Sequence, residues 1–150
     1  MMNIRKATQK DLKQLSQLFD GYRQFYQQAT DLDGARDFIQ LRMENNQSVI
    51  FVAEQQDKLL GFTQLFPSYS SVSLQCLWIL NDLFVAATAR EQGVAEALMH
   101  AARDFAESTH SKGIILETDW DNVQAQKLYD KLGYQKQEST YHYFLPSQVG

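Results

Sequence analysis

The chain has few of the residues that interrupt or cross-link a fold. Its 150 residues include 2 prolines, 7 glycines and a single cysteine, Cys76. So few prolines and glycines leave no candidate for a flexible linker, and a lone cysteine cannot form an intrachain disulfide. No internal repeat is visible. We therefore expect one domain over residues 1–150, with Cys76 as a small buried hydrophobic residue in a strand.

Long apolar runs and excess positive charge are also missing. No stretch approaches the roughly 18 apolar residues of a membrane-spanning helix, and residues 1–6 lack the apolar core of a signal peptide. The net charge of −4 argues against nucleic acid as an obligate partner. These absences predict a cytoplasmic protein with no membrane, nucleic-acid or metal partner. A homodimer remains open.

The residues that are present suit a globular α/β fold, since 44% are hydrophobic and 21% are charged. Apolar and β-branched patterns predict strands over residues 3–7, 48–54, 59–66, 72–85, 114–118 and 141–145. Helical spacing predicts helices from Thr8 to about Gln28, from Asp31 or Asp33 to Asn45-Asn46, from Val94 to about His110, and over 123–132. The order βααβββαβαβ predicts an α/β sandwich with a mixed central sheet.

The most informative segment joins the strand that ends at Val85 to the helix that begins at Val94. It reads Arg90-Glu91-Gln92-Gly93-Val94-Ala95. First-turn N–H groups of a helix have no intrahelical partner, and the helix dipole adds partial positive charge there. Gly93 has no Cβ, which lets a phosphate approach the backbone. We expect a phosphate-binding loop. The alternative is a plain turn in which glycine relieves crowding.

A second informative segment runs from Asn122 to Tyr134. With the loop, it resembles the GNAT superfamily of acyl-CoA-dependent N-acetyltransferases. The R-x-x-G-x-A loop is similar to that family's pyrophosphate-binding motif, and N-x-x-A-x-x-L-Y-x-x-x-G-Y is similar to its later cofactor-contacting helix. The resemblance covers roughly Leu77 to Leu145. It implies a GNAT-like mixed sheet with helices on both faces.

The resemblance also implies acetyl-CoA as cosubstrate and assigns residues to it. Main-chain groups of Phe84 and Val85 would pair with the pantetheine arm. Asn122 would hydrogen-bond that arm and Ala125 would leave space for it, although Asn122 also suits an ordinary helix cap. The residues implied for the pyrophosphate are Arg90, Glu91, Gln92, Gly93, Val94 and Ala95.

Acetyl transfer to an amine needs a base and an acid. An alkyl amine has a pKa near 10, like lysine, so it must lose a proton before it can attack the thioester. Tyr129 stands at the family's tyrosine position, which implies both cofactor contact and a general-acid role toward the leaving thiolate. The alternative is a tyrosine that only packs on an amphipathic helix.

The base is harder to assign. The segment Asn81–Val85, the loop and residues 119–122 resemble the spermidine/spermine acetyltransferase branch, which carries Glu-Asp where this chain has Asn81-Asp82. Asn81 cannot accept a proton, so Asp82 is the nearest candidate. Strand alternation places the two on opposite faces unless a bulge re-aims one of them. Glu117, Asp119 and water relayed to Asn81 and Asp82 are alternatives.

We expect the first two helices and residues 67–71 to form the acceptor pocket. Tyr22 and Tyr26 lie in an aromatic cluster that suits core packing, or an ammonium held by cation–π attraction. The acceptor is a primary amine of a small molecule, polyamine, amino acid or peptide, with protein lysine as an alternative. Two other functions stay open, namely a non-catalytic acyl-CoA-binding or regulatory domain and a partner-binding domain in which the loop is only a turn.

Overall fold

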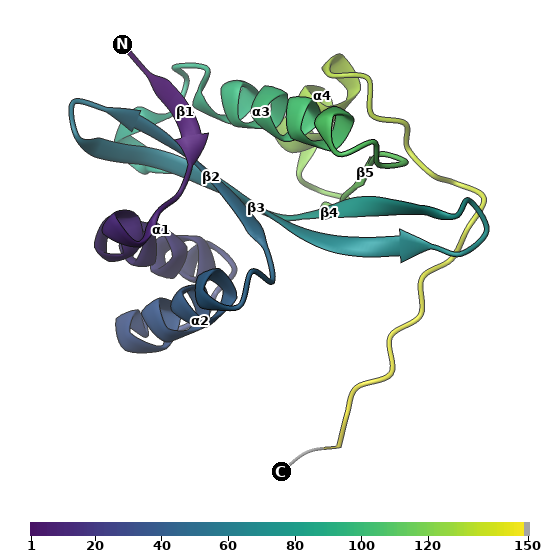
Figure 1. Cartoon of the computed structure of the whole chain (residues 1–150), viewed down its shortest axis with the longest axis horizontal. Coiled ribbons are helices and arrows are strands. Elements are labelled where there is room, and N and C mark those ends of the chain that lie inside the picture. Colours follow the sequence, from purple (N-terminus) through teal and green to yellow (C-terminus); the bar gives the residue numbers. More distant parts are fainter. Residues whose placement is uncertain (149–150) are drawn as a thin grey trace. The chain divides into compact units, whose positions relative to one another are not determined.

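The computed structural model describes residues 1–148, which form two compact units divided after Glu117. The first unit contains β1 (Asn3–Lys6), a 3-10 turn (Gln9–Asp11), α1 (Leu12–Phe25), α2 (Leu32–Glu44), β2 (Val49–Gln55), β3 (Lys58–Ser70), β4 (Gln75–Val85), a 3-10 turn (Ala87–Ala89), α3 (Val94–Ser108) and β5 (Ile114–Ile115). The second contains α4 (Val123–Lys131). Figure 1 labels these helices and strands.

The five strands of the first unit form one mixed sheet in the order β1-β2-β3-β4-β5. The first four pair antiparallel, and β5 runs parallel to β4. Gln56 and Asp57 form the two-residue turn between β2 and β3. Both have positive φ, 52° and 62°, as the tight turn of a twisted hairpin requires. The mixed sheet agrees with the prediction from sequence.

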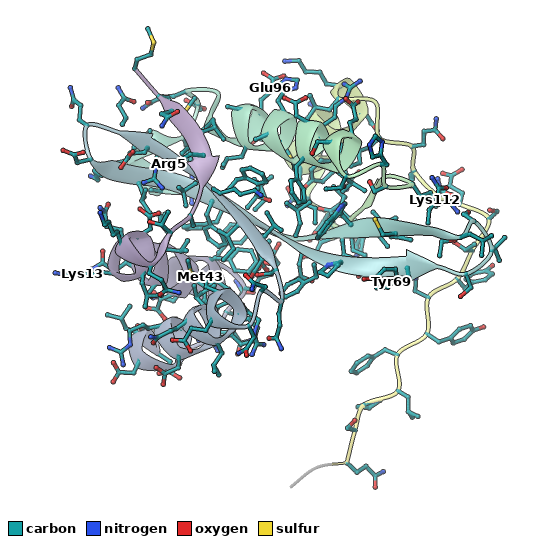
Figure 2. All side chains as sticks on the ribbon, viewed as in Figure 1. Arg5, Lys13, Met43, Tyr69, Glu96 and Lys112 are labelled. Atoms are coloured by element: carbon teal, nitrogen blue, oxygen red, sulfur yellow. The ribbon has the colours of Figure 1, made fainter. Side chains whose placement is uncertain are left out.

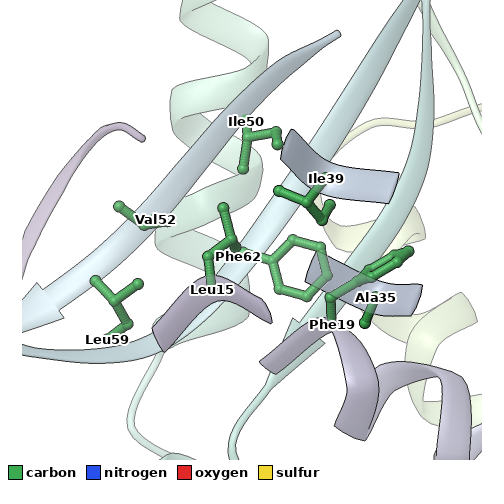
Figure 3. Packing of buried hydrophobic residues seen from close by; sticks show 8 residues of the cluster. All are labelled: Leu15, Phe19, Ala35, Ile39, Ile50, Val52, Leu59 and Phe62. Carbon is green, nitrogen blue, oxygen red and sulfur yellow. The ribbon is translucent and has the colours of Figure 1, made fainter. Parts of the chain in front are cut away.

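Helices cover both faces of this sheet (Figure 1). Alternate residues of β2 point to opposite faces. Ile50 and Val52 pack in a cluster with α1 and α2, whereas the ring of Phe51 lies 5.7 Å from that of Phe105 on α3. Figure 3 shows the cluster between the sheet and the α1–α2 pair. Its buried members are Leu15, Phe19, Ala35, Ile39, Ile50, Val52, Leu59 and Phe62.

The entry to α1 is fixed by a charged group. Arg5, labelled on β1 in Figure 2, contacts the carboxylate of Asp11 at 2.7 Å and that of Glu54 at 3.1 Å. The same Asp11 carboxylate accepts a hydrogen bond from the backbone N–H of Thr8, which completes a capping box. These contacts join β1 and β2 to the start of α1. The Arg5 guanidinium holds the pKa of Asp11 below its usual value.

Asp20 fixes the connection between α1 and α2. It is 6% exposed, and its carboxylate accepts hydrogen bonds from the Asp31 backbone N–H at 2.8 Å and the Thr30 hydroxyl at 2.6 Å. Asp31 in turn caps α2 by accepting from the Gly34 N–H at 3.0 Å. The prediction that an aspartate begins the second helix is therefore confirmed for Asp31.

Two predicted strand boundaries are wrong. The strand expected to end at residue 66 continues as β3 to Ser70, and Pro67 pairs with Trp78 of β4. β2 pairs with β3 only as far as Leu65, so Pro67 lies where β3 has an open edge and the missing N–H is tolerated. The strand expected over 114–118 is limited to Ile114–Ile115.

Residues 141–145 form no strand, although their composition favours one. Four of their side chains, those of Tyr141, Tyr143, Phe144 and Leu145, are 88–95% exposed. A strand needs a neighbouring strand for its backbone hydrogen bonds, and composition cannot supply one. Among the described residues, no helix is both long and apolar enough to cross a membrane.

Candidate active site

A bulge in β4 is the central feature of the site. Gln64 pairs with Asp82 and Leu65 pairs with Leu80, so Asn81 is an extra residue on β4 that has no partner on β3. A bulge interrupts the alternation of side chains along a strand. Asn81 and Asp82 consequently line the same pocket, although they are consecutive in sequence.

Two side chains hold the backbone of the bulge. The Thr63 hydroxyl donates to the carbonyl oxygen of Asp82 at 2.8 Å, within the sheet. The Tyr22 hydroxyl donates to the carbonyl oxygen of Asn81 at 3.2 Å, from α1. The contact of Thr63 is buried, where a backbone carbonyl needs a hydrogen-bond partner, and that of Tyr22 is exposed. Both contacts stabilise the irregular backbone at this position.

Asp82 is a buried carboxyl group, only 3% exposed. Its Oδ2 accepts from the Gln64 amide at 2.5 Å and its Oδ1 accepts from the Asn81 amide at 3.0 Å. Burial raises the pKa of Asp82 above its usual value, while side-chain hydrogen bonds, that of Gln64 foremost, act in the opposite direction. A carboxylate whose pKa is raised in a pocket is a good candidate for a proton acceptor.

The pocket in front of Asp82 has a volume of about 300 Å³. Besides β4, its lining residues come from α1 and from α2 with its capping residue. Residues 67–71, also expected at the acceptor pocket, do not line this pocket. Tyr22 lines the pocket, whereas Tyr26 is not among its lining residues. The lining residues are Phe19, Tyr22, Arg23, Asp31, Gly34, Ala35, Phe38, Asn81 and Asp82.

Tyr26 instead packs against other aromatic rings of α1. Its ring lies 5.1 Å from that of Tyr22 in an edge-to-face arrangement, and its side chain is partly exposed. The stacked rings of Phe19 and Phe38, 5.6 Å apart, line the pocket itself. The pocket therefore combines an aromatic wall with the carboxylates of Asp31 and Asp82.

Beyond the bulge, β4 has an open edge. Among the described residues, β5 pairs with β4 only at Trp78 and Ile79. The Ala86 N–H donates to the Leu60 carbonyl oxygen at 2.8 Å, so these two residues form a hydrogen-bonded pair. Hydrogen-bonded and non-hydrogen-bonded pairs alternate along antiparallel strands, so the adjacent pair, Gly61 with Val85, has no mutual hydrogen bonds. The main-chain groups of Val85 therefore point away from β3, toward this edge.

The loop before α3 has the conformation that its glycine permits. Gly93 precedes the helix with φ 79°, and Glu91 also has positive φ, 63°. A Cβ built on Gly93 would meet no atom within 4 Å, so this glycine does not relieve crowding. Its role is to adopt a left-handed backbone at an open helix N-terminus. Arg90 lies beside the loop, with its Nε 3.4 Å from the Val85 carbonyl oxygen.

In the second unit, Asn122 caps α4. Its side-chain oxygen accepts from the Ala125 N–H at 3.3 Å, which confirms the capping role considered from sequence. The Tyr129 ring lies 5.8 Å from that of Tyr134, which follows the end of the helix. Gly133, with φ 91°, lies between the helix end and Tyr134.

Sequence reasoning missed Gln64, which is fully buried and hydrogen-bonded to Asp82. The signal was a polar Thr63-Gln64 pair in the middle of an apolar strand. Of the alternative bases, Glu117 does not line the pocket, and Asp119 belongs to the second unit. Within residues 1–148, no group of three or more His, Cys, Asp or Glu side chains is placed to hold a metal ion.

Comparison with known proteins identifies the family. The model of the acetyltransferase (GNAT) family matches residues 13–134, and the chain belongs to this family. It is 44% identical over 144 residues to the uncharacterized N-acetyltransferase YhfO of Bacillus subtilis, covering 96% of this chain and 97% of the relative. It is 38% identical over 117 residues to a probable acetyltransferase of Haemophilus influenzae, covering 77% and 80% of the two chains.

Solved structures agree with this assignment. A crystal structure of a probable acetyltransferase matches with a TM-score of 0.92 and 39% identity, covering 99% of both chains. An aminoglycoside N-acetyltransferase in complex with CoA has the same fold, with a TM-score of 0.81 and 19% identity, covering 98% of this chain and 96% of that one. The GNAT fold expected from sequence is confirmed, and the protein is an acetyltransferase.

The buried charge of Asp82 has a consequence for stability. A carboxyl group whose pKa is raised by folding destabilises the folded state at pH values above that raised pKa, and the penalty disappears below the unfolded pKa. We expect Asp82→Asn to increase the free energy of unfolding at pH 7, as measured by urea denaturation. The gain should shrink as the pH falls toward 4.

Asp20→Asn is the matched control, because Asp20 is similarly inaccessible but its pKa is lowered, chiefly by the backbone hydrogen bond from Asp31. A lowered pKa stabilises the folded state above the unfolded pKa, so this variant should be less stable at pH 7. A loss of stability in both variants would contradict the environment described for Asp82.

Proposed function

We propose that the protein is an acetyl-CoA-dependent N-acetyltransferase that transfers the acetyl group directly to a primary amine. The observation that carries this proposal is the bulge at Asn81, which turns the buried carboxyl group of Asp82 into a pocket with an aromatic wall. Family membership supplies the reaction class. The acceptor amine enters this pocket, and Asp82 takes its proton.

The cofactor contacts are proposed from the family motif together with local geometry. The open edge of β4 at Val85 offers main-chain hydrogen bonds to the pantetheine arm. Phe84 is assigned to the arm from its motif position alone, because its main-chain groups face β3. The helix N-terminus of α3, preceded by the uncrowded Gly93, suits the pyrophosphate. Arg90 to Ala95 surround that position, with Arg90 adding positive charge. Asn122 and Ala125 are assigned to the pantetheine from their motif positions alone.

The proposed reaction proceeds from deprotonation of the acceptor amine to release of CoA. Asp82 removes one proton from the ammonium, and the free amine attacks the thioester carbonyl carbon. Backbone N–H groups of the irregular strand stabilise the negative charge on the carbonyl oxygen. The C–S bond breaks as the intermediate collapses and its nitrogen loses a second proton to solvent, which leaves the neutral N-acetylated product and a thiolate. Tyr129 donates a proton to that thiolate, which yields CoA, and then regains a proton from solvent.

The pocket favours a small primary amine with an apolar body. The carboxylate of Asp82 attracts an ammonium group, and the faces of aromatic rings such as Phe19 and Phe38 attract cations and cover apolar atoms. A volume near 300 Å³ lies at the small end of ligand pockets. A polyamine, an amino acid, a peptide and a protein lysine remain acceptors to test, with Tyr22 and Tyr26 as the proposed aromatic contacts.

A diamine acetyltransferase of the spermidine/spermine kind is a narrower version of this proposal. Asn81 stands where that branch carries glutamate, so the site has one carboxylate fewer on β4. The same substitution favours a second candidate, a non-catalytic acyl-CoA-binding domain. Release of free thiol from acetyl-CoA across a panel of amines, followed with a thiol reagent, distinguishes an enzyme from a binding domain.

We further propose that residues 1–150 act as one N-acetyltransferase domain, because the family match crosses the boundary after Glu117. A cytoplasmic location, a homodimer, and the lack of nucleic-acid and membrane partners stay predictions from composition. No metal is needed for the steps above.

Acetyl-CoA should raise the melting temperature, since a ligand that binds only the folded state stabilises it. Gly93→Asp should abolish this shift, because it places negative charge beside the proposed pyrophosphate. Gly93→Asn is the matched control, since Asn has the same shape without the charge and tolerates a left-handed backbone. It should retain more of the shift. An equal shift in wild type and in folded Gly93→Asp would remove the cofactor site from this loop.

Asp82→Asn should lower kcat/KM most at neutral pH, by roughly 10²-fold, because the variant cannot accept the proton of the ammonium. The deficit should decrease at higher pH, where more amine is already deprotonated. Steady-state rates from pH 6 to 10 test this, with Glu117→Gln and Asp119→Asn as comparisons. A deficit that does not change with pH would assign Asp82 a structural role.

Tyr129→Phe should reduce turnover by roughly 10²-fold, the scale of a lost general acid, while acetyl-CoA affinity stays close to that of wild type. Tyr134→Phe is the control, since it removes one hydroxyl from the neighbouring ring. If Tyr129→Phe turns over as fast as wild type, the thiolate leaves without help or takes its proton from water.

A further inference from the structure

A second buried side chain, on the neighbouring strand β3, is hydrogen-bonded to Asp82. Gln64 on β3 lies directly opposite Asp82 in the strand register and is 0% exposed. Its Nε2 donates to Oδ2 of Asp82 at 2.5 Å, and its Oε1 accepts from the Ser48 hydroxyl at 2.7 Å. Ser48 directly precedes β2. A line of hydrogen bonds therefore runs from the start of β2, across β3, to the pocket.

The direction of these bonds has a chemical meaning. An amide has one end that only donates and one that only accepts, whereas a serine hydroxyl can do either. The Ser48 hydroxyl donates to the oxygen end of Gln64, which leaves the donating NH₂ end against Asp82. A donor stabilises the ionised form of a carboxylate over the neutral form. The Ser48 contact thus anchors the Gln64 amide in an orientation that favours a charged Asp82.

The contacts also orient the carboxylate. Gln64 holds Oδ2 from within the sheet, and Asn81 holds Oδ1. A carboxylate has about four acceptor positions, so the positions that these bonds leave are available to an ammonium in the pocket. A buried amide is costly unless it is hydrogen-bonded, and Phe62 and Leu65 on the same strand are apolar and fully buried. If the residue at position 64 served packing alone, an apolar side chain would suffice there.

We propose that Gln64, anchored by Ser48, is a positioning residue that keeps the carboxylate of Asp82 ionised and directs its remaining acceptor positions into the acceptor pocket. This inference rests on the proposed role of Asp82 as base. Other groups also face the pocket: Tyr22 and Arg23 from α1, Asp31 from α2, and Asn81 from β4. They are unchanged in the variants below, so those variants isolate the Ser48–Gln64 pair.

The test uses the full-length protein and two readouts. The pKa of Asp82 is measured by ¹³C NMR of labelled aspartate, with its signal assigned from Asp82→Asn, and the pH profile of kcat/KM is measured in parallel. Gln64→Met keeps the length of the side chain and removes its donor. We expect the pKa of Asp82 to rise and the acid limb of the profile to move to higher pH. A shift of one unit lowers kcat/KM on that limb about tenfold.

Two further variants separate orientation from packing. Ser48→Ala should move both readouts in the same direction by a smaller amount, because Gln64 is then free to turn. Ser48→Thr retains the hydroxyl and should restore the wild-type values. Ser48→Ala also keeps the test valid should Gln64→Met fail to fold, because a half-buried serine outside the strands tolerates truncation.

The outcomes are distinguishable. An unchanged pKa of Asp82 in folded Gln64→Met, or in Ser48→Ala where Gln64→Met does not fold, overturns the inference. A uniform loss of kcat at every pH with an unchanged pKa also overturns it and indicates a structural role. A raised pKa with an unmoved acid limb establishes the effect of Gln64 on the carboxylate, but refutes Asp82 as the base and with it the proposed mechanism.

Discussion

One inserted residue in β4 determines which side chains of that strand line the pocket. Without the bulge at Asn81, alternation would send the side chains of Asn81 and Asp82 to opposite faces of the sheet. With it, both line the pocket beneath α1 and α2. The Thr63 and Tyr22 hydroxyls complete the hydrogen bonding of the displaced carbonyl groups. The bulge therefore leaves neither of these carbonyl groups without a hydrogen-bond partner, and it is a stable part of the fold.

The first unit contains two buried aspartates that differ in what surrounds them. Asp20 accepts a backbone N–H and the Thr30 hydroxyl, and its pKa falls below the usual value. Asp82 accepts from side-chain amides, and burial is the larger influence, so its pKa rises. At similar exposure, the surroundings thus lower the pKa of Asp20, which favours its charged form, and raise the pKa of Asp82, which favours its protonated form.

Local signals in the sequence were sufficient for the parts of the fold that depend on local chemistry. The Gln56-Asp57 turn, the Thr8 capping box and the Asp31 cap each require only a few neighbouring residues. The loop and helix of the family motif were also recognisable, which fixed the acetyltransferase class. The predicted roles of Arg90 to Ala95, Asn122, Ala125 and Tyr129 remain predictions.

What the sequence could not provide depends on strand pairing. The bulge is defined by the partners of Gln64 and Leu65 across two strands, and no local pattern records it. No local pattern predicts that Gln64 pairs with Asp82 either. The place of Pro67 within β3 likewise depends on another strand, because it depends on where β2 ends. Residues 141–145 show the reverse case, a strand-like composition without a paired neighbour in the structure.

The position of Pro67 has a consequence for solubility. Past Leu65, β3 continues toward Ser70 with β4 on one side and no strand of the described chain on the other. An open strand edge offers free N–H and C=O groups to other molecules, and such edges promote aggregation. Proline removes one donor from this edge. Substitution by valine would complete the row of donors, and this segment of β3 would become a surface on which misfolded chains assemble.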